Sequence, residues 1–333
     1  MQYRRLGRTG LNVSILSLGS GGENRFGQAR HVPRKDIHRL VRSALELGIN
    51  FFDTSAAYEQ SESLLGEALR GVPKNSYYLA TKIFPRHGNR VLGGAETRRL
   101  VDRSLRRLNV DELDILQLHG VTPDTYLETR DRLMPELERL QAEGKVRYIG
   151  ITESSKRDPQ HRMLRSALQD NLFDTIMVAY DLSNRSAEKV VFPLAQANDV
   201  GVIAMAVARY NVPRSAATRV KLFAWSLASL AASLPDWGGF KVRLQGVLSA
   251  LTRSGPRQGL DLARTSGGTP LQLPEAAYTF AASQPAVATV LTGTTSLVHL
   301  QRNVVAVLES ALTAEEIGAL LALLNHRKLT RPD

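Results

Sequence analysis

Four polar side chains in this sequence could together move a proton. Asp53, Lys82 and His119 each end an apolar stretch, and Tyr58 follows Asp53 by five residues. A tyrosine hydroxyl ionises only near pH ~10, but a neighbouring ammonium group stabilises its phenolate form. A carboxylate beside the lysine would keep that ammonium charged, and a histidine could orient a carbonyl oxygen or share the proton. These residue types therefore predict a proton relay for carbonyl chemistry near neutral pH.

Each residue also has an ordinary structural interpretation. Asp53 could cap the following helix, Lys82 could reach solvent, His119 could be a satisfied buried residue, and Tyr58 could be a loop aromatic. Their joint placement on three successive apolar stretches favours a common site. The relay contains no nucleophile, and no histidines show metal-ligand spacing such as His-Glu-x-x-His. The sequence therefore predicts no metal site.

The elements that must position these residues alternate regularly along the chain. Apolar runs occur at 15–19, 49–54, 77–82, 113–119, 146–152, 175–180, 201–207 and 286–293. Most are continuously apolar, which is typical of parallel strands buried on both faces. Amphipathic stretches that predict helices lie at 61–69, 95–108, 127–141, 162–169 and 187–198. Eight strand–helix repeats predict an α/β fold, a closed (β/α)8 TIM barrel with its active site at the C-terminal ends of the strands.

Three segments fall outside this repeat. Residues 3–12 resemble a β-hairpin, which we expect to cap the barrel floor. After the seventh strand the spacing lengthens, and we expect residues 208–270 to form a long rim insertion within a single barrel domain, 1–333. Residues 313–324, with acidic residues in the first turn, predict a closing helix.

Composition excludes several classes of protein. Of 333 residues, 43% are hydrophobic and 23% are charged, which excludes a disordered or collagen-like chain. Cysteine is absent, so disulfides and thiolate sites are excluded. The net charge of +11 is spread without a basic run or interleaved aromatics, so we predict a solvated basic surface and no nucleic-acid partner. No stretch of ~20 apolar residues and no signal peptide is present, so we predict a cytoplasmic protein with no membrane partner.

The segments around the four polar residues resemble the aldo-keto reductase family. They are GINFFDTS at 48–55, Tyr58, SESLLGEAL at 61–69, Thr81 with Lys82, DILQLH at 114–119 and EGKVRYIG at 143–150. The resemblance runs in order from Leu6 to about Leu308, with 208–270 unmatched. It implies a (β/α)8 barrel that binds NAD(P)H, with Asp53, Tyr58, Lys82 and His119 as catalytic residues. Tyr58 would supply or remove the proton while hydride passes between nicotinamide and the substrate carbonyl carbon.

The resemblance also implies a cofactor site. Its positions are Ser20, Gly21, Asp53, Thr152, Glu153, Met177, Met205, Gly293, Thr294, Thr295, His299 and Asn303. Thr152 can replace the family's serine hydroxyl, Glu153 can accept but donates only when protonated, and Met177 cannot act as an amide. Met205 can still cover the nicotinamide ring. Residues 19–22 are glycine-rich, but the third glycine of a Rossmann fingerprint would fall at Asn24.

Residues 293–296 open a helix whose backbone N–H groups suit a cofactor phosphate. The alternative is an ordinary helix cap by Ser296. NADPH-preferring relatives carry basic residues at the positions of Gly293 or Thr295 and of His299, so we predict that NAD(H) is tolerated or preferred. Arg302 and His299 are candidate compensating residues for a 2′-phosphate.

These observations predict an NAD(P)-dependent oxidoreductase that acts on a small aldehyde, ketone or sugar, in a pocket formed by Phe26, Phe84, Tyr180 and the long loop 208–270. Two alternatives stay open. One is a nucleotide-binding redox-sensing or scaffolding barrel with little turnover. The other is a phosphate-handling lyase or isomerase in which Lys82 forms a Schiff base. The oligomeric state is left open.

Overall fold

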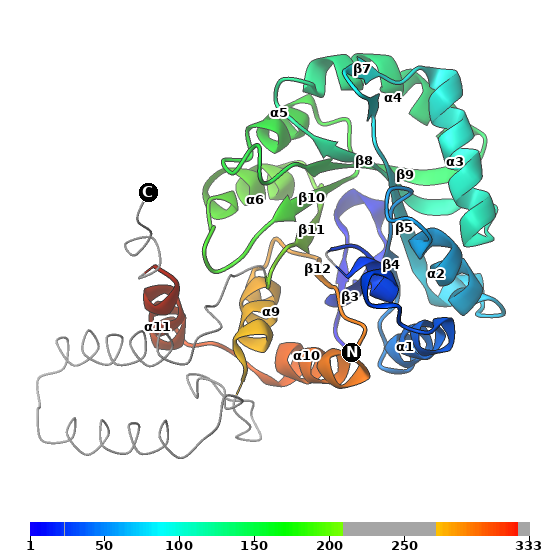
Figure 1. Cartoon of the computed structure of the whole chain (residues 1–333). Helices are drawn as coiled ribbons and strands as arrows, with labels where there is room; N and C mark the ends of the chain where they lie inside the picture. Colours follow the sequence, from blue (N-terminus) through cyan, green and yellow to red (C-terminus); the bar gives the residue numbers. More distant parts are fainter. Residues whose placement is uncertain (23, 209–270, 326–333) are drawn as a thin grey trace, which may run out of the picture.

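Eight parallel strands close into a barrel in the computed structural model, which describes residues 1–22, 24–208 and 271–325. Around the barrel the strands are β3 (Leu16–Gly19), β4 (Phe51–Asp53), β5 (Tyr78–Ile83), β8 (Leu113–Val121), β9 (Val146–Glu153), β10 (Thr175–Ala179), β11 (Gly201–Met205) and β12 (Thr289–Thr292). Figure 1 shows the helices arranged outside them. The predicted (β/α)8 barrel is confirmed, and each strand overlaps one of the eight apolar runs. The expected insertion, apart from Ala208, lies outside the described residues.

The helices follow the strands as predicted, with two additions. They are α1 (Arg34–Glu46), α2 (Ser61–Leu69), α3 (Gly94–Leu108), α4 (Tyr126–Ala142), α5 (Arg162–Asp170), α6 (Ala187–Ala197), α9 (Leu273–Ser283), α10 (Leu297–Glu309) and α11 (Ala314–Asn325). Short 3-10 helices occur at Gly7–Thr9, Arg25–Arg30 and Lys74–Ser76, and β6 (Arg86–His87) pairs with β7 (Arg90–Val91). Helices α1 and α9 were not predicted. None of the helices in the described residues is long and apolar enough to span a membrane.

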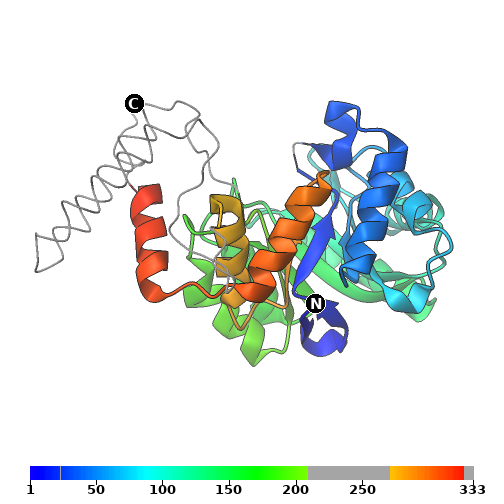
Figure 2. The same cartoon turned by 90° about the horizontal axis from the view of Figure 1, so that it is seen from below.

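An N-terminal hairpin closes one end of the barrel (Figure 2). Strands β1 (Tyr3–Arg5) and β2 (Asn12–Ser14) pair antiparallel, as expected for this segment. Between them Leu6 and Leu11 are buried in the same apolar cluster as Phe51, which lies inside the barrel. Burial of these leucines drives the hairpin against the strands because it removes apolar surface from water. The barrel therefore opens for ligands at the opposite end.

Two helices on the outer layer approach each other closely. A Cβ added at Gly66 in α2 would lie 2.6 Å from the carbonyl oxygens of Arg107 and Leu108, at the end of α3. Backbone atoms cannot rotate away as a side chain can, so this contact requires glycine. This packing holds α2 against the C-terminal end of α3.

Candidate active site

Strand alternation directs the predicted catalytic residues into the barrel. Phe51 and Ala80 lie in its interior cluster, two positions before Asp53 and Lys82. Side chains two apart on a strand share a face, so Asp53 and Lys82 point inward at the C-terminal ends of β4 and β5. The same alternation places Gln117 and His119 on the inner face of β8. The structure brings residues from three neighbouring strands to one point.

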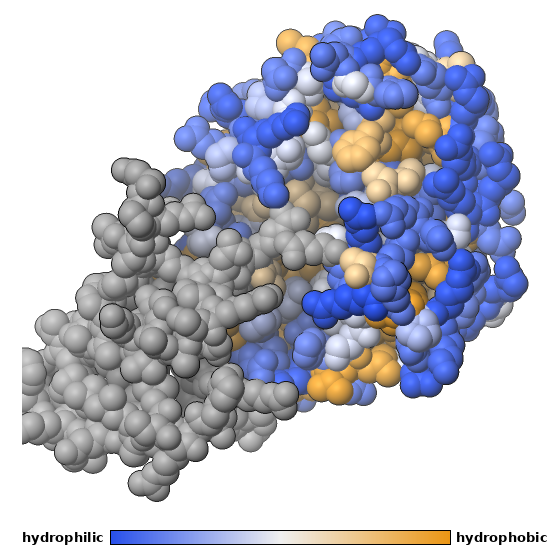
Figure 3. Space-filling model, in the orientation of Figure 1, coloured by the Kyte–Doolittle hydropathy of each residue, from blue (hydrophilic) through white to orange (hydrophobic). Residues whose placement is uncertain are grey.

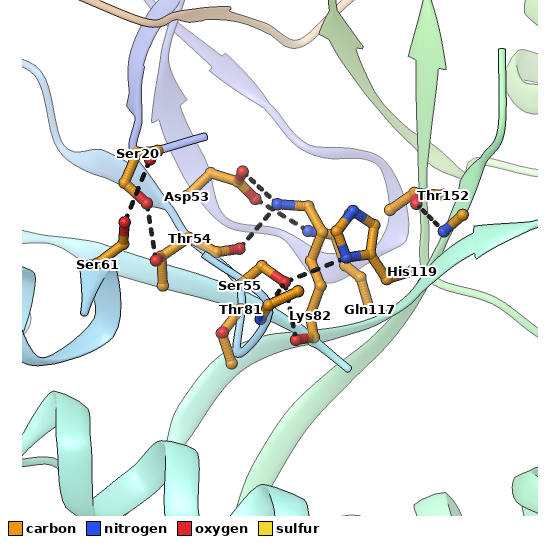
Figure 4. Close-up of polar contacts among 12 residues, drawn as sticks. Ser20, Asp53, Thr54, Ser55, Ser61, Thr81, Lys82, Gln117, His119 and Thr152 are labelled. Atoms are coloured by element: carbon orange, nitrogen blue, oxygen red, sulfur yellow. Dashed lines mark hydrogen bonds and ion pairs between the residues drawn. The ribbon is translucent and has the colours of Figure 1, made fainter. Parts of the chain in front are cut away.

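Lys82 is the centre of a buried hydrogen-bond network (Figure 4). Its ammonium donates to the Asp53 carboxylate and, over 2.8 Å, to the carbonyl oxygen of Thr54. Gln117 donates to the second Asp53 oxygen over 3.1 Å. Burial alone would lower the pKa of Lys82, but the charge and hydrogen bonding of Asp53 and Tyr58 outweigh it and raise that pKa. The lysine therefore stays protonated at neutral pH.

The phenol of Tyr58 lies beside this ammonium. Lys82 Nζ is 5.3 Å from the centre of the Tyr58 ring. Gln28 fixes the loop, since its side-chain amide donates to the Tyr58 carbonyl oxygen over 3.1 Å and accepts from the Gln60 N–H over 3.0 Å. The predicted cofactor residue Gly21 packs against the phenol, where an added Cβ would lie 2.6 to 2.9 Å from ring atoms and the hydroxyl oxygen. Gly21 therefore makes room for the ring.

His119 forms the other side of the Tyr58 pocket. The two rings meet edge to face with centres 5.6 Å apart, and Phe84 stacks on the imidazole at 4.5 Å. Burial, together with the positive charge of Lys82, lowers the pKa of His119 to about 3, so the imidazole is neutral at physiological pH. Its Nδ1 lies 3.1 Å from the Ser55 hydroxyl, which leaves Nε2 for a ligand. Ser55 was not predicted.

A cavity of about 640 Å³ opens above these residues. Its lining includes seven predicted site residues, namely Tyr58, Lys82, His119, Thr152, Glu153, Met177 and Met205. Phe84 lines it as expected, but Phe26 and Tyr180 do not. Tyr180 is fully buried against Phe192 and Phe280, with ring centres 5.0 and 5.3 Å away. The prediction for Tyr180 was wrong because side chains alternate between the two faces of a strand. Met177 points into the barrel, so Tyr180, three positions later, points outward.

Thr152 and Glu153 differ in what they can offer a ligand. Thr152 Oγ1 accepts from the Gly120 N–H over 2.7 Å. No described residue accepts the proton of the Thr152 hydroxyl, so this hydroxyl can donate to an amide oxygen in the cavity. Glu153 is already bonded through both oxygens, to the Ala179 N–H at 2.8 Å and to His161 Nδ1 at 2.7 Å. Burial raises the pKa of Glu153. With Met177 and Met205 as apolar cover, this part of the cavity fits a nicotinamide ring and its carboxamide.

The predicted phosphate loop follows β12. Ser296 caps α10, since its hydroxyl accepts from the His299 N–H over 3.3 Å, and Thr294 Oγ1 accepts from the Ser296 N–H over 3.1 Å. Asn24 donates to Thr295 Oγ1 over 3.0 Å and so ties the loop after β3 to the loop after β12. The capping alternative is therefore present. It leaves other N–H groups of the first turn for an anion.

The remaining predicted cofactor residues are held by neighbours. Asn303 donates to Thr292 Oγ1 over 3.0 Å, and Ser20 donates to Thr54 Oγ1 over 2.7 Å. Gly293 is exposed beside them. Arg302 forms an ion pair with the buried Glu275 at 2.8 Å, which restrains the guanidinium that could have compensated for missing phosphate ligands. In the described part of 293–303, His299 is the basic residue without an ion pair.

The model of the Aldo/keto reductase family matches residues 17–210. The chain belongs to this family. Among relatives of this aldo-keto reductase, L-galactose dehydrogenase of Arabidopsis thaliana is 38% identical over 157 residues, 46% of this chain and about half (48%) of that protein's length. The uncharacterized oxidoreductase YqkF of Bacillus subtilis is 27% identical over 336 positions, covering 96% of this chain and 95% of that one.

Solved structures support the same assignment. The holo form of aldo-keto reductase AKR11C1 from Bacillus halodurans has a TM-score of 0.68 at 28% identity, covering 97% of this chain and 96% of that one. An aldo-keto reductase from Klebsiella pneumoniae in complex with NADPH shares the fold, with a TM-score of 0.66 at 22% identity over 97% of this chain and 95% of that one. Membership in the aldo-keto reductase family assigns carbonyl–alcohol oxidoreduction with a nicotinamide cofactor as the class of reaction.

Proposed function

We propose that this aldo-keto reductase interconverts an aldehyde, ketone or sugar with its alcohol, with Tyr58 as general acid and base. The observation that carries the proposal is the position of the Tyr58 phenol, at the cavity between charged Lys82 and neutral His119. A sugar is a candidate substrate because one relative is named as a sugar dehydrogenase.

The nicotinamide, when bound, supplies or accepts the hydride. Thr152 donates to its carboxamide, and Met177 and Met205 exclude water around the ring. During reduction His119 Nε2 holds the carbonyl oxygen and Tyr58 donates a proton to that oxygen. The Lys82 ammonium stabilises the phenolate that results.

Asp53 and Gln117 do not need to touch the substrate in this scheme. Asp53 holds the Lys82 ammonium in place and balances its charge, and Gln117 orients the Asp53 carboxylate. In the oxidation direction the phenolate removes the alcohol proton, and the same residues act in reverse order. No other acid or base is required.

Substitution of Tyr58 by Phe tests the relay. Tyr58→Phe removes the proton donor and retains the ring, so kcat for aldehyde reduction is expected to fall by about 10²- to 10⁴-fold. Tyr3→Phe is the matched control, because the Tyr3 hydroxyl donates to Gly48 at the hairpin, far from the cavity. A Tyr58→Phe enzyme that retains the wild-type rate excludes the relay.

We further propose that NAD(H) is tolerated or preferred. The support is the absence of a free lysine or arginine in the described segment 293–303, together with the ion pair that restrains Arg302. A 2′-phosphate would gain little there, since phosphate recognition depends on such cations. Comparison of KM for NADH and NADPH tests this choice. A hundredfold preference for NADPH contradicts it.

A nucleotide-binding barrel with little turnover is the second candidate. It is favoured by Glu153, whose oxygens are both bonded within the protein, and by Met177, which cannot bond an amide. Tight NADH binding without oxidation across a panel of aldehydes would support it. The Schiff-base alternative is disfavoured, since the raised pKa of Lys82 opposes the neutral amine that this chemistry needs. Borohydride trapping tests it directly.

A further inference from the structure

One wall of the cavity carries basic side chains that the proposed reaction does not use. Arg86 follows β5, and Lys156 and Arg157 follow β9. We call these three residues the basic wall. Lys156 and Arg157 are exposed. Figure 3 shows that hydrophilic residues cover much of the described surface on this view of the molecule.

The charges that face this cavity do not cancel. Lys82 is neutralised by Asp53, and Arg86 by Glu128 at 3.1 Å. Neither Lys156 nor Arg157 forms an ion pair with any described residue.

The acids among the described residues of this lining are Glu153 and Asp124. Glu153 is turned toward His161 and is bonded through both oxygens. Asp124, in the loop after β8, stays ionised because hydrogen bonds from Thr122 and from its own backbone, with the charges of Arg157 and Arg86, lower its pKa. Glu153 is paired with His161, so among the described lining residues Asp124 is the carboxylate that faces the two unpaired cations of the basic wall.

Neutral donors accompany the cations. Ser154, Ser155 and Asn89 line the same cavity, and their side chains have no hydrogen-bond partner in the described residues. A guanidinium offers two parallel N–H groups that match the two oxygens of a carboxylate, and hydroxyls and amides can satisfy the remaining lone pairs. The wall therefore has the composition of an anion site. Its position on the lining shared with Tyr58 and His119 indicates a substrate that reaches both.

We propose that the basic wall binds a carboxylate at the far end of the carbonyl substrate, so that the enzyme acts on aldehyde acids or keto acids. This inference rests on the proposed function for the carbonyl end. A carboxylate is favoured over a phosphate because Asp124, on the same lining, would repel a dianion more strongly than a monoanion. The cavity of about 640 Å³ leaves room for such a substrate beside a nicotinamide.

Matched acids and esters test the inference. The substrates are 4-carboxybenzaldehyde with its methyl ester, and succinic semialdehyde with its methyl ester, each assayed with NADH and NADPH. The acids are expected to have at least tenfold higher kcat/KM than their esters. Arg157→Gln is expected to raise KM about tenfold for the acids and less than twofold for the esters, with kcat nearly unchanged, because charge-assisted hydrogen bonds would be lost only for the acids. Lys156→Gln is expected to act in the same direction.

Arg39→Gln is the control for net charge. Arg39 is exposed on α1 and has no ion pair among the described residues, so its loss removes one positive charge away from the cavity. The acid preference is expected to persist in this variant. Thermal unfolding of all three variants checks that folding is intact.

Each contrary result has a distinct meaning. Equal kcat/KM for acids and esters in the wild type overturns the inference and leaves the proposed function standing. Failure to reduce the two acids while another aldehyde, ketone or sugar is turned over overturns the inference alone, and failure with a full panel of aldehydes, ketones and sugars, with cofactor bound, overturns both. If Arg157→Gln weakens NADPH binding in a direct titration and leaves the acid preference unchanged, the wall serves the cofactor and the inference is overturned.

Discussion

Gly21 offers a sharp test because a single methyl group would reach the catalytic phenol. The Cβ of an alanine would lie 2.6 Å from Tyr58 Cε2 and 2.9 Å from the hydroxyl oxygen. Ordinary carbon contacts are about 3.5–4.0 Å, so the ring must retreat by about 1 Å. The ring is the free end of a half-buried side chain, so its displacement should cost no more than about 1 kcal/mol of folding stability. A shift of about 1 Å in a catalytic group can reduce turnover about 100-fold, equivalent to ~2.7 kcal/mol in the barrier.

The assay compares kcat for aldehyde reduction in Gly21→Ala, Tyr58→Phe and the double variant. If the methyl group acts through the phenol, it is expected to cost little once the hydroxyl is gone, so the double variant should resemble Tyr58→Phe. Gly318→Ala in α11 is the control, since nothing lies within 4 Å of its added Cβ. Two results would refute the reasoning: a Gly21→Ala enzyme within twofold of wild type, or an effect fully additive with Tyr58→Phe.

Three further outcomes follow from contacts described above. Ser55→Ala removes the 3.1 Å contact to His119 Nδ1. It is expected to lower kcat/KM about five- to tenfold in steady-state kinetics, since one hydrogen bond contributes ~1 kcal/mol. An unchanged kcat/KM would show that Phe84 stacking alone holds the His119 ring. The pKa of His119 is about 3 when folded against 6.5 ordinarily, so the unfolded chain binds more protons between these values, and stability should fall as pH drops from 6.5 toward 3. This site can contribute up to ~1.4 kcal/mol per pH unit, which denaturant unfolding at pH 7 and pH 5 should detect and His119→Gln should remove. Gly66→Ala is expected to destabilise the fold by ~1–3 kcal/mol through its backbone contacts. Gly318→Ala, in an exposed helix position, should stabilise the fold slightly. Equal melting temperatures for the two variants would contradict the close approach of α2 and α3.

The barrel and the central residues of the site were predictable from the sequence for one physical reason. Parallel strands buried on both faces are continuously apolar, so a polar residue that ends such a run marks the open end of the barrel. Asp53, Lys82 and His119 stood out in this way, and the structure places them together. Gln117 carried the same signal, as an amide two positions before His119 within an apolar run, and was overlooked.

Other features depend on contacts between distant parts of the chain. The partnership of Glu153 with His161 joins the end of β9 to the start of α5, and no pattern in the sequence fixes which histidine turns toward the carboxylate. Helix α9 is buried on nearly every side, so it lacks the polar face that reveals a helix. Helix α1 did carry a signal, because Ile37, Leu40, Val41 and Ala44 repeat at helical spacing.

The hairpin that seals the lower end of the barrel has a kinetic consequence. Leu6 and Leu11 pack beneath Phe51 and the interior of the barrel is filled with side chains, so both reactants must reach Tyr58 through the cavity at the other end. Whichever molecule sits deeper has to arrive first and depart last. Ordered sequential kinetics are therefore expected. An excess of the reactant that binds nearer the entrance would trap the deeper one and inhibit the enzyme at high substrate concentration.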